Sequence, residues 1–153
     1  MGNGMENCMH FIITRFNLRL YDWDKNNMPT RTDGWLSHRF DLFEKYCLPS
    51  MCRQTSGNFT WLCLFDKDTP EKYHKRIASY SGICPQFHAV FYDREQSHTL
   101  IESIRTTVGE HTRGKGVDYV ISTNLDNDDA LSVDAVKNIQ EKVAPAGKRT
   151  IYS

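Results

Sequence analysis

The sequence predicts an α/β fold in which helices flank a mostly parallel sheet. Four short apolar runs rich in β-branched and aromatic residues alternate along the chain with segments of helical period. Each connection between two runs is long enough for the crossover of a βαβ unit, and such crossovers are right-handed. This alternation is typical of a parallel sheet between two layers of helix. The 153 residues are enough for one domain with a sizeable core.

The predicted strands are the apolar runs themselves. The second run is almost continuously apolar rather than alternating, which indicates a strand that is covered on both faces. We therefore expect four neighbouring parallel strands and a buried side chain at Trp61. The runs occupy residues 10–14, 59–65, 87–92 and 119–123.

The first predicted helix follows a polar loop at residues 26–34. Pro49 lies within this helical segment, where it lacks a backbone donor and its ring clashes with the carbonyl of Lys45. We therefore expect a kink or a break near Pro49. The apolar side chains recur at steps of three and four residues and would share one face. They are Trp35, Leu42, Phe43, Tyr46, Cys47 and Met51.

Three further helices complete the pattern. Thr69 and Pro70 suit the N-cap and the first position of the second helix, and Ser97 suits the cap of the third. The fourth helix is expected to end near residues 145–147, and residues 149–153 have the composition of another strand. The predicted apolar faces are Tyr73, Ile77 and Tyr80; Leu100, Ile101, Ile104 and Val108; and Val133, Val136, Ile139 and Val143.

Composition argues against several classes of partner and location. Lys plus Arg number 19, as do Asp plus Glu, whereas a surface for nucleic acid or an anionic membrane needs a basic surplus. No apolar run approaches the ~20 residues that span a bilayer, and the first residues do not form a signal peptide. The five cysteines include no C-x-x-C pair and favour buried free thiols in a reducing compartment. We therefore expect a cytoplasmic protein.

The strongest functional signal is the acidic segment at residues 125–130, which follows the fourth predicted strand. Ligands of open α/β sheets bind beyond the carboxyl ends of the strands. Asp126, Asp128 and Asp129 place three carboxylates within four residues, and a cation that prefers oxygen ligands, Mn²⁺ or Mg²⁺, relieves their mutual repulsion. Alternatively, these carboxylates cap the fourth helix and favour the positive end of its dipole. The two interpretations do not exclude each other.

Other candidate substrate-binding residues lie near the ends of predicted strands or on the third helix. Thr14 ends the first predicted strand and Arg15 follows it, where the strand opens into a loop. The guanidinium of Arg15 suits a diphosphate; alternatively, it pairs with an acid at the surface. Asp66 and Asp68 follow the second strand and would bind a base or a ribose, or else belong only to the loop and the next helix start. Arg105 either reaches a phosphate or is a solvated helix charge.

Three segments resemble family 2 glycosyltransferases. Residues 42–55, followed by residues 58–66, resemble the part of that family in which an S-hydrophobic-x-x-Q-T helix end precedes a strand that finishes in Asp. Residues 119–129 resemble the strand that leads to its D-x-D motif, and the whole resemblance covers residues 9–145. The features that bring the chain closest to the rhamnosyltransferase group are residues 14–17, Trp61 and residues 125–131.

The resemblance implies a GT-A fold, which is a Rossmann-like three-layer sandwich, together with a nucleotide diphosphate sugar and a divalent metal. It implies that Asp128 binds the metal, that Asp126 contacts the ribose or sugar of the donor, and that Asp66 contacts the base or ribose. The sequence departs from the family at residues 66–68, where Asp-Lys-Asp replaces the common pair of adjacent aspartates. Either Asp66 or Asp68 is therefore the residue that meets the nucleotide.

The predicted reaction is an inverting transfer of a sugar, with rhamnose as the first candidate, to a hydroxyl of a glycan or lipid-linked glycan. The metal and Arg15 would stabilise the departing diphosphate. We expect a flexible N-terminus at residues 1–8 and a truncated nucleotide-sugar-binding domain at residues 9–153, with the catalytic base and acceptor site beyond this chain. We also expect self-association, in the cytoplasm or at the inner face of the membrane. The alternatives are a non-catalytic nucleotide-binding or interaction module and a nucleotidyltransferase.

Overall fold

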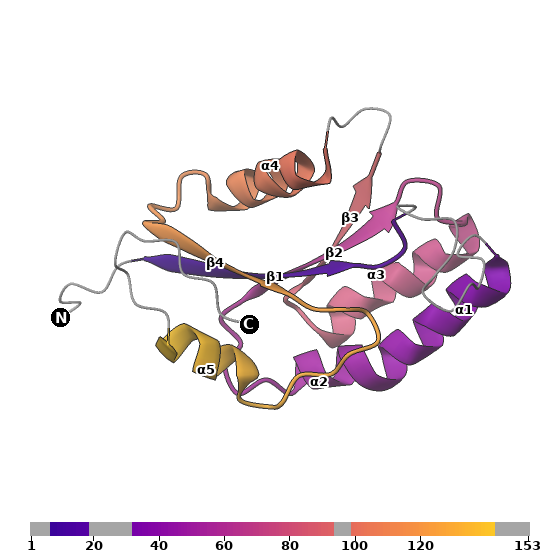
Figure 1. Cartoon of the computed structure of the whole chain (residues 1–153), viewed down its shortest axis with the longest axis horizontal. Coiled ribbons are helices and arrows are strands. Elements are labelled where there is room, and N and C mark those ends of the chain that lie inside the picture. Colours follow the sequence, from indigo (N-terminus) through magenta and orange to yellow (C-terminus); the bar gives the residue numbers. More distant parts are fainter. Residues whose placement is uncertain (1–6, 19–31, 94–98, 143–153) are drawn as a thin grey trace.

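The chain folds into an α/β domain, of which the computed structural model describes residues 7–18, 32–93 and 99–142 (Figure 1). Strands and helices alternate along it, as predicted. The strands are β1 (Cys8–Arg15), β2 (Thr60–Asp66), β3 (Phe87–Tyr92) and β4 (Tyr119–Asn124). The helices are α1 (Asp33–Leu42), the π-helix η1 (Phe43–Cys47), α2 (Leu48–Cys52), the 3₁₀-helix η2 (Glu71–Tyr73), α3 (His74–Ile83), α4 (Leu100–Thr112) and α5 (Ala135–Lys142).

The four strands form one parallel sheet in the order β3-β2-β1-β4. β1 pairs with β2 on one side and with β4 on the other, so that Ile12 lies beside both Trp61 and Thr123. Because all strands run the same way, their carboxyl ends meet at one edge. The chain moves from β1 toward β3 on one side and then returns to place β4 on the other, so the strand order switches beside β1. The predicted parallel sheet is confirmed.

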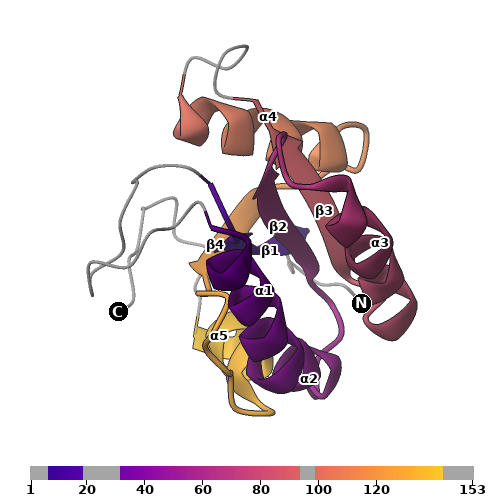
Figure 2. The same cartoon turned by 90° about the vertical axis from the view of Figure 1, so that its right-hand side faces the viewer.

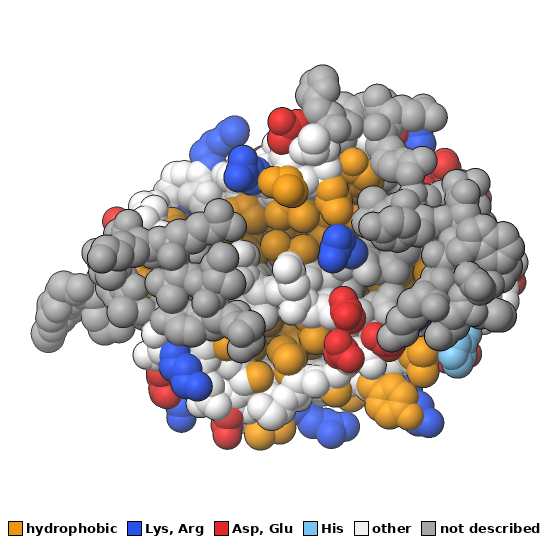
Figure 3. Space-filling view, in the orientation of Figure 1, with side chains coloured by type: hydrophobic (Ala, Val, Ile, Leu, Met, Phe, Trp, Pro, Cys, Tyr) orange, Lys and Arg blue, Asp and Glu red, His pale blue; other side chains and the backbone are white. Residues whose placement is uncertain are grey.

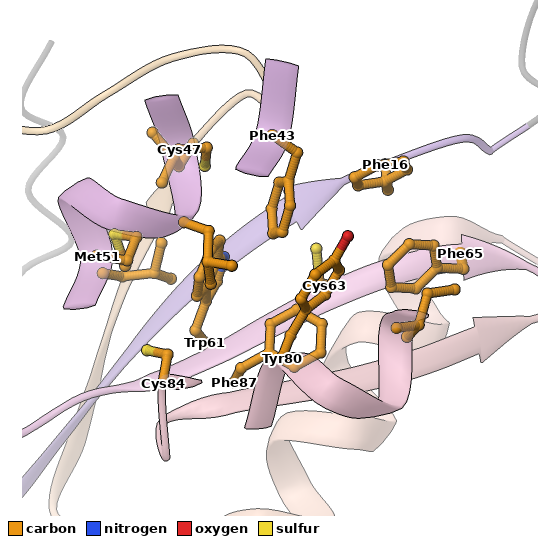
Figure 4. Close-up of a cluster of buried hydrophobic side chains, with 14 of the residues drawn as sticks. Phe16, Phe43, Cys47, Met51, Trp61, Cys63, Phe65, Tyr80, Cys84 and Phe87 are labelled. Carbon is orange, nitrogen blue, oxygen red and sulfur yellow. The ribbon is translucent and has the colours of Figure 1, made fainter. Parts of the chain in front are cut away.

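Helices cover both faces of the sheet and give the molecule three layers (Figure 2). α1, η1, α2, α3 and α5 pack on one face, whereas α4 packs on the other. The larger core lies under the first group and is rich in aromatic rings (Figure 4). The smaller core consists of Phe11, Ile13, Leu62 and Leu64 beneath α4. The Rossmann-like three-layer arrangement that the sequence predicts is therefore present.

β2 is a deeply buried strand because strands flank it on both sides and helices cover both of its faces. Its residues 61–66 are all buried, as its nearly continuous apolar run indicates. Trp61 is fully buried, and its indole Nε1 donates a 2.9 Å hydrogen bond to Oγ1 of Thr14. The Trp61 ring centroid lies 5.4 Å from those of Phe43 and Phe87. Trp61 thus packs against the helix layer through its ring and links β2 to β1 through its single donor.

The first helical segment changes its hydrogen-bonding pattern just before Pro49. In η1 the N–H of Leu48 reaches the carbonyl of Phe43, five residues earlier, and Pro49 then falls in the first turn of α2. The expected break is therefore a π-helical widening that accommodates the proline. Placing Tyr46 on the buried face was wrong: its side chain is 45% exposed beside Lys45, because it lies one position off the buried stripe. The buried residues are Leu36, Phe40, Phe43, Cys47, Leu48 and Met51.

Two predicted helix caps differ from the observed ones. The hydroxyl of Thr69 donates to the carbonyl of Asp66 at 2.6 Å, inside a turn closed by the N–H of Thr69, so it does not cap a helix. The cap of α4 is Thr99, whose hydroxyl accepts from the N–H of Glu102 at 3.0 Å. Ser97, the cap that we expected, lies outside the described residues.

Two apolar residues that we placed on helix faces are exposed. Ile101 is 62% exposed because α4 turns its neighbours Leu100 and Ile104 toward the sheet instead. Val133 is 51% exposed because it precedes α5, which buries only Val136 completely. The predicted end of the fourth helix, the strand predicted at residues 149–153 and the first six residues lie outside the described part of the chain.

The structure confirms the expected free thiols, but the expected burial holds for three of the five cysteines. All five cysteines are free thiols, and Cys47, Cys63 and Cys84 are buried. Burial raises the pKa of Cys84 to about 11, so its thiol stays protonated. Cys52, in contrast, is exposed. Among the described residues, no helix combines the length and the apolar character that crossing a membrane requires.

Candidate functional site

The three carboxylates of the acidic segment are presented by a turn that directly follows β4. The N–H of Leu125 donates to the carbonyl of Ile13 at 3.0 Å, which extends the pairing with β1 past the end of the strand. The N–H of Asp129 donates to the carbonyl of Asp126 at 3.2 Å and closes this acidic turn, residues 126–129. Asp126, Asp128 and Asp129 are exposed, and one carboxylate oxygen of each lies within 4.8 Å of the others. Figure 3 shows acidic side chains gathered near the middle of the face that it draws, which is the face seen in Figure 1.

The acidic turn is fixed from inside by Asn127, its one uncharged residue. The side chain of Asn127 is buried, unlike those of its neighbours. Its Nδ2 donates to the carbonyl of Phe16, just beyond β1, at 2.9 Å, and its Oδ1 accepts from Nη1 of Arg39 at 3.3 Å. Asn127 therefore orients the turn so that the carboxylates face outward. Sequence analysis missed this residue, although a lone amide within an acidic run was a usable signal.

Arg39 of α1 is a second residue that sequence analysis missed. Its Nη1 lies 2.9 Å from Oδ2 of Asp128, in an ion pair whose side chains are both partly exposed. The guanidinium carbon also lies over the ring of Trp35, 5.4 Å from its centroid, in a cation–π contact. Arg39 thus places one positive charge against three negative ones. No local sequence pattern predicts the contact between Arg39 and Asp128, because the two residues are 89 positions apart in the chain.

The segment after the acidic turn is held by Gln54 and Thr55, which follow α2. Nε2 of Gln54 donates to the carbonyl of Ser132 at 2.7 Å, and its Oε1 accepts from the N–H of Val136 in the first turn of α5 at 3.0 Å. Thr55 adds a backbone bond to the carbonyl of Val133 at 2.8 Å and a side-chain bond to Asp134 at 2.7 Å. These contacts, together called the α2 clamp, fix the path of the chain immediately beyond the carboxylates.

The cap interpretation of the acidic segment is wrong for this structure. α5 begins at Ala135, six residues after Asp129, and its first turn contains no acidic residue. The N–H group of Val136, in the first turn of α5, instead donates its hydrogen bond to Oε1 of Gln54. The carboxylates of the acidic turn therefore do not stabilise the helix start.

The donor set of the acidic turn fits a hard divalent cation. Around octahedral Mg²⁺ with oxygens at 2.0–2.1 Å, adjacent ligand oxygens lie roughly 3 Å apart and opposite ones roughly 4 Å apart. The oxygens of Asp126, Asp128 and Asp129 lie within 4.8 Å of one another, which is near that spacing. Because all three are exposed, positions for water or phosphate oxygens remain open.

Asp66 lies at the same sheet edge, on the other side of β1 from the acidic turn. Asn17 links it to the end of β1, because its Oδ1 accepts from the N–H of Asp66 at 3.1 Å and its Nδ2 donates to Thr69 at 3.0 Å. Asp66 is buried, and its carboxylate accepts from the N–H of Asp68 at 2.9 Å. Asp68 itself is exposed. The structure thus assembles loops from three strands around the end of β1.

The remaining candidates are divided between the site and other parts of the molecule. Arg15 is exposed at the carboxyl end of β1, at the shared edge. Thr14 is fully buried and its hydroxyl accepts from Trp61, so its side chain belongs to the core. Arg105 is exposed on α4, in the helix layer opposite the one that contacts the acidic turn. Their roles in binding stay predictions.

Comparison with known protein families identifies the chain. A family model described as "Putative rhamnosyl transferase" matches residues 13–149. The chain belongs to this family. The match runs from the end of β1 through the α2 clamp and the acidic turn, and membership in the rhamnosyl transferase family supports a glycosyltransferase-like function. No curated protein and no solved structure gives a significant match.

Proposed function

We propose that the acidic turn and the end of β1 bind a nucleotide diphosphate sugar together with Mn²⁺ or Mg²⁺, for transfer of the sugar to an acceptor hydroxyl. One observation carries the proposal. Three carboxylates face outward from a turn that is anchored beside the switch in strand order, in a member of the rhamnosyl transferase family. Ligands of open parallel sheets bind at this position. Rhamnose is the first candidate for the sugar, following the family description.

Under this proposal each residue has a distinct task. Asp128, with Asp126 and Asp129, holds the cation, which when bound would neutralise charge on the departing diphosphate. Arg15, exposed at the end of β1, lies at the same edge and is suited to the phosphate oxygens. Asp66 is placed on the opposite side of β1, where it would meet the base or ribose of the donor.

Calorimetry of Mn²⁺ binding, with and without a nucleoside diphosphate, tests the proposal. We expect weak binding of the metal alone and tighter binding with the nucleotide, because phosphate oxygens complete the coordination shell. Asp128→Asn should remove this coupling while the circular dichroism spectrum is retained. Glu110→Gln, which removes an exposed charge on α4, is the matched control and should behave as wild type. Metal affinity that is unchanged by nucleotide in the wild-type chain would contradict the site.

A further inference from the structure

Arg39 forms an ion pair with Asp128, whose carboxylate the proposed cation site requires. Within residues 7–18, 32–93 and 99–142, the ion pair made by the acidic turn is the one between Arg39 and Asp128. We propose that Arg39 is a built-in counter-ion of the acidic turn, which pairs with Asp128 while no divalent cation is bound and leaves it when the cation arrives. This inference rests on the proposed function, because it concerns the same carboxylates.

The geometry of the pair favours exchange over permanent pairing. Both hydrogen bonds of Arg39 to the turn come from a single nitrogen, Nη1, so the two-pronged contact that makes Arg–carboxylate pairs strong is not used. The side chains of Arg39 and Asp128 are 23% and 43% exposed. Ion pairs with this exposure are weak, since water screens the charges. Asp128 can therefore be released at little cost.

Arg39 also has contacts that do not depend on Asp128. Oδ1 of Asn127 lies 3.3 Å from Nη1, and the ring of Trp35 lies beneath the guanidinium. These contacts hold the side chain beside the turn after it gives up the carboxylate. A positive charge kept there opposes the binding of a cation, because both compete for the same three negative charges. The expected result is a metal affinity set lower than the carboxylates alone would give.

Removing the charge of Arg39 tests this inference directly. For Arg39→Gln we expect Mn²⁺, titrated without nucleotide, to bind about three- to fivefold more tightly than to wild type, the range that a partly exposed ion pair allows. Arg39→Lys keeps the charge and should keep affinity near the wild-type value. Arg113→Gln removes an exposed positive charge at the end of α4 and controls for net charge. Equal affinities for Arg39→Gln and Arg113→Gln would overturn the inference.

Trp35 gives a second readout, which is measured first in the wild-type chain. Since the guanidinium lies 5.4 Å from this ring, the loss of its bond to Asp128 on Mn²⁺ addition should alter the charge next to the ring and with it the tryptophan emission of the wild-type chain. Trp35→Phe should abolish that change, and Arg39→Gln should reduce it. Binding of Mn²⁺ to the wild type with no emission change and no effect of Arg39→Gln would overturn the inference and leave the proposed function intact. Absence of any Mn²⁺ binding, in contrast, would overturn both.

Discussion

Replacing Gln54 tests whether the α2 clamp holds the acidic turn in place. The side chain forms two bonds to another segment, a donated one to the carbonyl of Ser132 at 2.7 Å and an accepted one from the N–H of Val136 at 3.0 Å. A third bond, to the carbonyl of Ser50 at 3.1 Å, stays within the α2 region. Each bond between segments contributes about 0.5–1.5 kcal/mol. Gln54→Ala should therefore lower the free energy of unfolding by about 1–3 kcal/mol.

Urea denaturation measures this loss, and two further variants sharpen it. Gln54→Glu retains an acceptor for Val136 but brings a carboxylate oxygen against the Ser132 carbonyl, so it should destabilise at least as much as Gln54→Ala. Glu141→Ala, an exposed change on α5, is the control and should have almost no effect. A midpoint for Gln54→Ala equal to that of wild type, with an unchanged slope, would show that packing alone holds the segment and that the clamp is incidental.

Two further predictions concern the core. Trp61→Ala should cost about 3–5 kcal/mol in urea denaturation, because it empties the centre of the larger core and leaves Thr14 without its donor; a near-neutral result would contradict the packing of β2. Burial lowers the pKa of His10 from 6.5 to about 4. As the pH falls, the imidazole is therefore protonated in the unfolded chain before it is protonated in the folded one. Stability should consequently fall by about 2 kcal/mol from about pH 7 to about pH 5. His10→Gln should flatten this dependence, and an equally steep profile in that variant would assign it to other groups.

The sheet could be predicted because two local signals agree. Apolar runs of strand length alternate with segments of helical period, and the near-continuous run that contains Trp61 indicates cover on both faces. The buried face of the first helical segment, which comprises α1, η1 and α2, was harder to predict from the sequence. Tyr46 has the spacing of a buried residue, yet π-helical hydrogen bonding near Pro49 and the packing of Phe43 decide which residues face the sheet. The π-helical hydrogen bonding and the packing of Phe43 depend on the folded structure around them, which the spacing of apolar residues does not record.

Caps were mispredicted for a related reason. Thr69 has the composition of an N-cap, but a turn at the end of β2 uses both its N–H and its hydroxyl. The pattern records which side chains are able to cap, whereas the surrounding backbone decides which of them do so.

The residues of the candidate site also fall into those that the sequence predicts and those that only the fold brings together. Asp126, Asp128 and Asp129 were predictable because one short segment contains them and repulsion between neighbouring carboxylates needs no fold to be recognised. Arg39 and Gln54 were not, because they meet the segment around the acidic turn across 89 and 78 residues of chain. The metal and the nucleotide of the donor stay predictions that the experiments above address, and the expected self-association also stays a prediction.

The residues around the acidic turn explain how a cluster of like charges is tolerated at the surface. The backbone is tied to β1 through Leu125, the Asn127 side chain reaches the carbonyl beyond β1, and the following segment is tied to α2 through Gln54. These attachments use neutral amides and backbone groups, so none of them occupies a carboxylate of the turn. Within the described part of the chain, the side chain that pairs with one of these carboxylates is Arg39. A turn whose backbone is fixed while its charged oxygens stay exposed needs little further ordering when a ligand binds. The glutamine of the S-x-x-x-Q-T pattern therefore has a physical contact to account for it: Gln54 holds Ser132, 78 residues away, in the segment that follows the acidic turn.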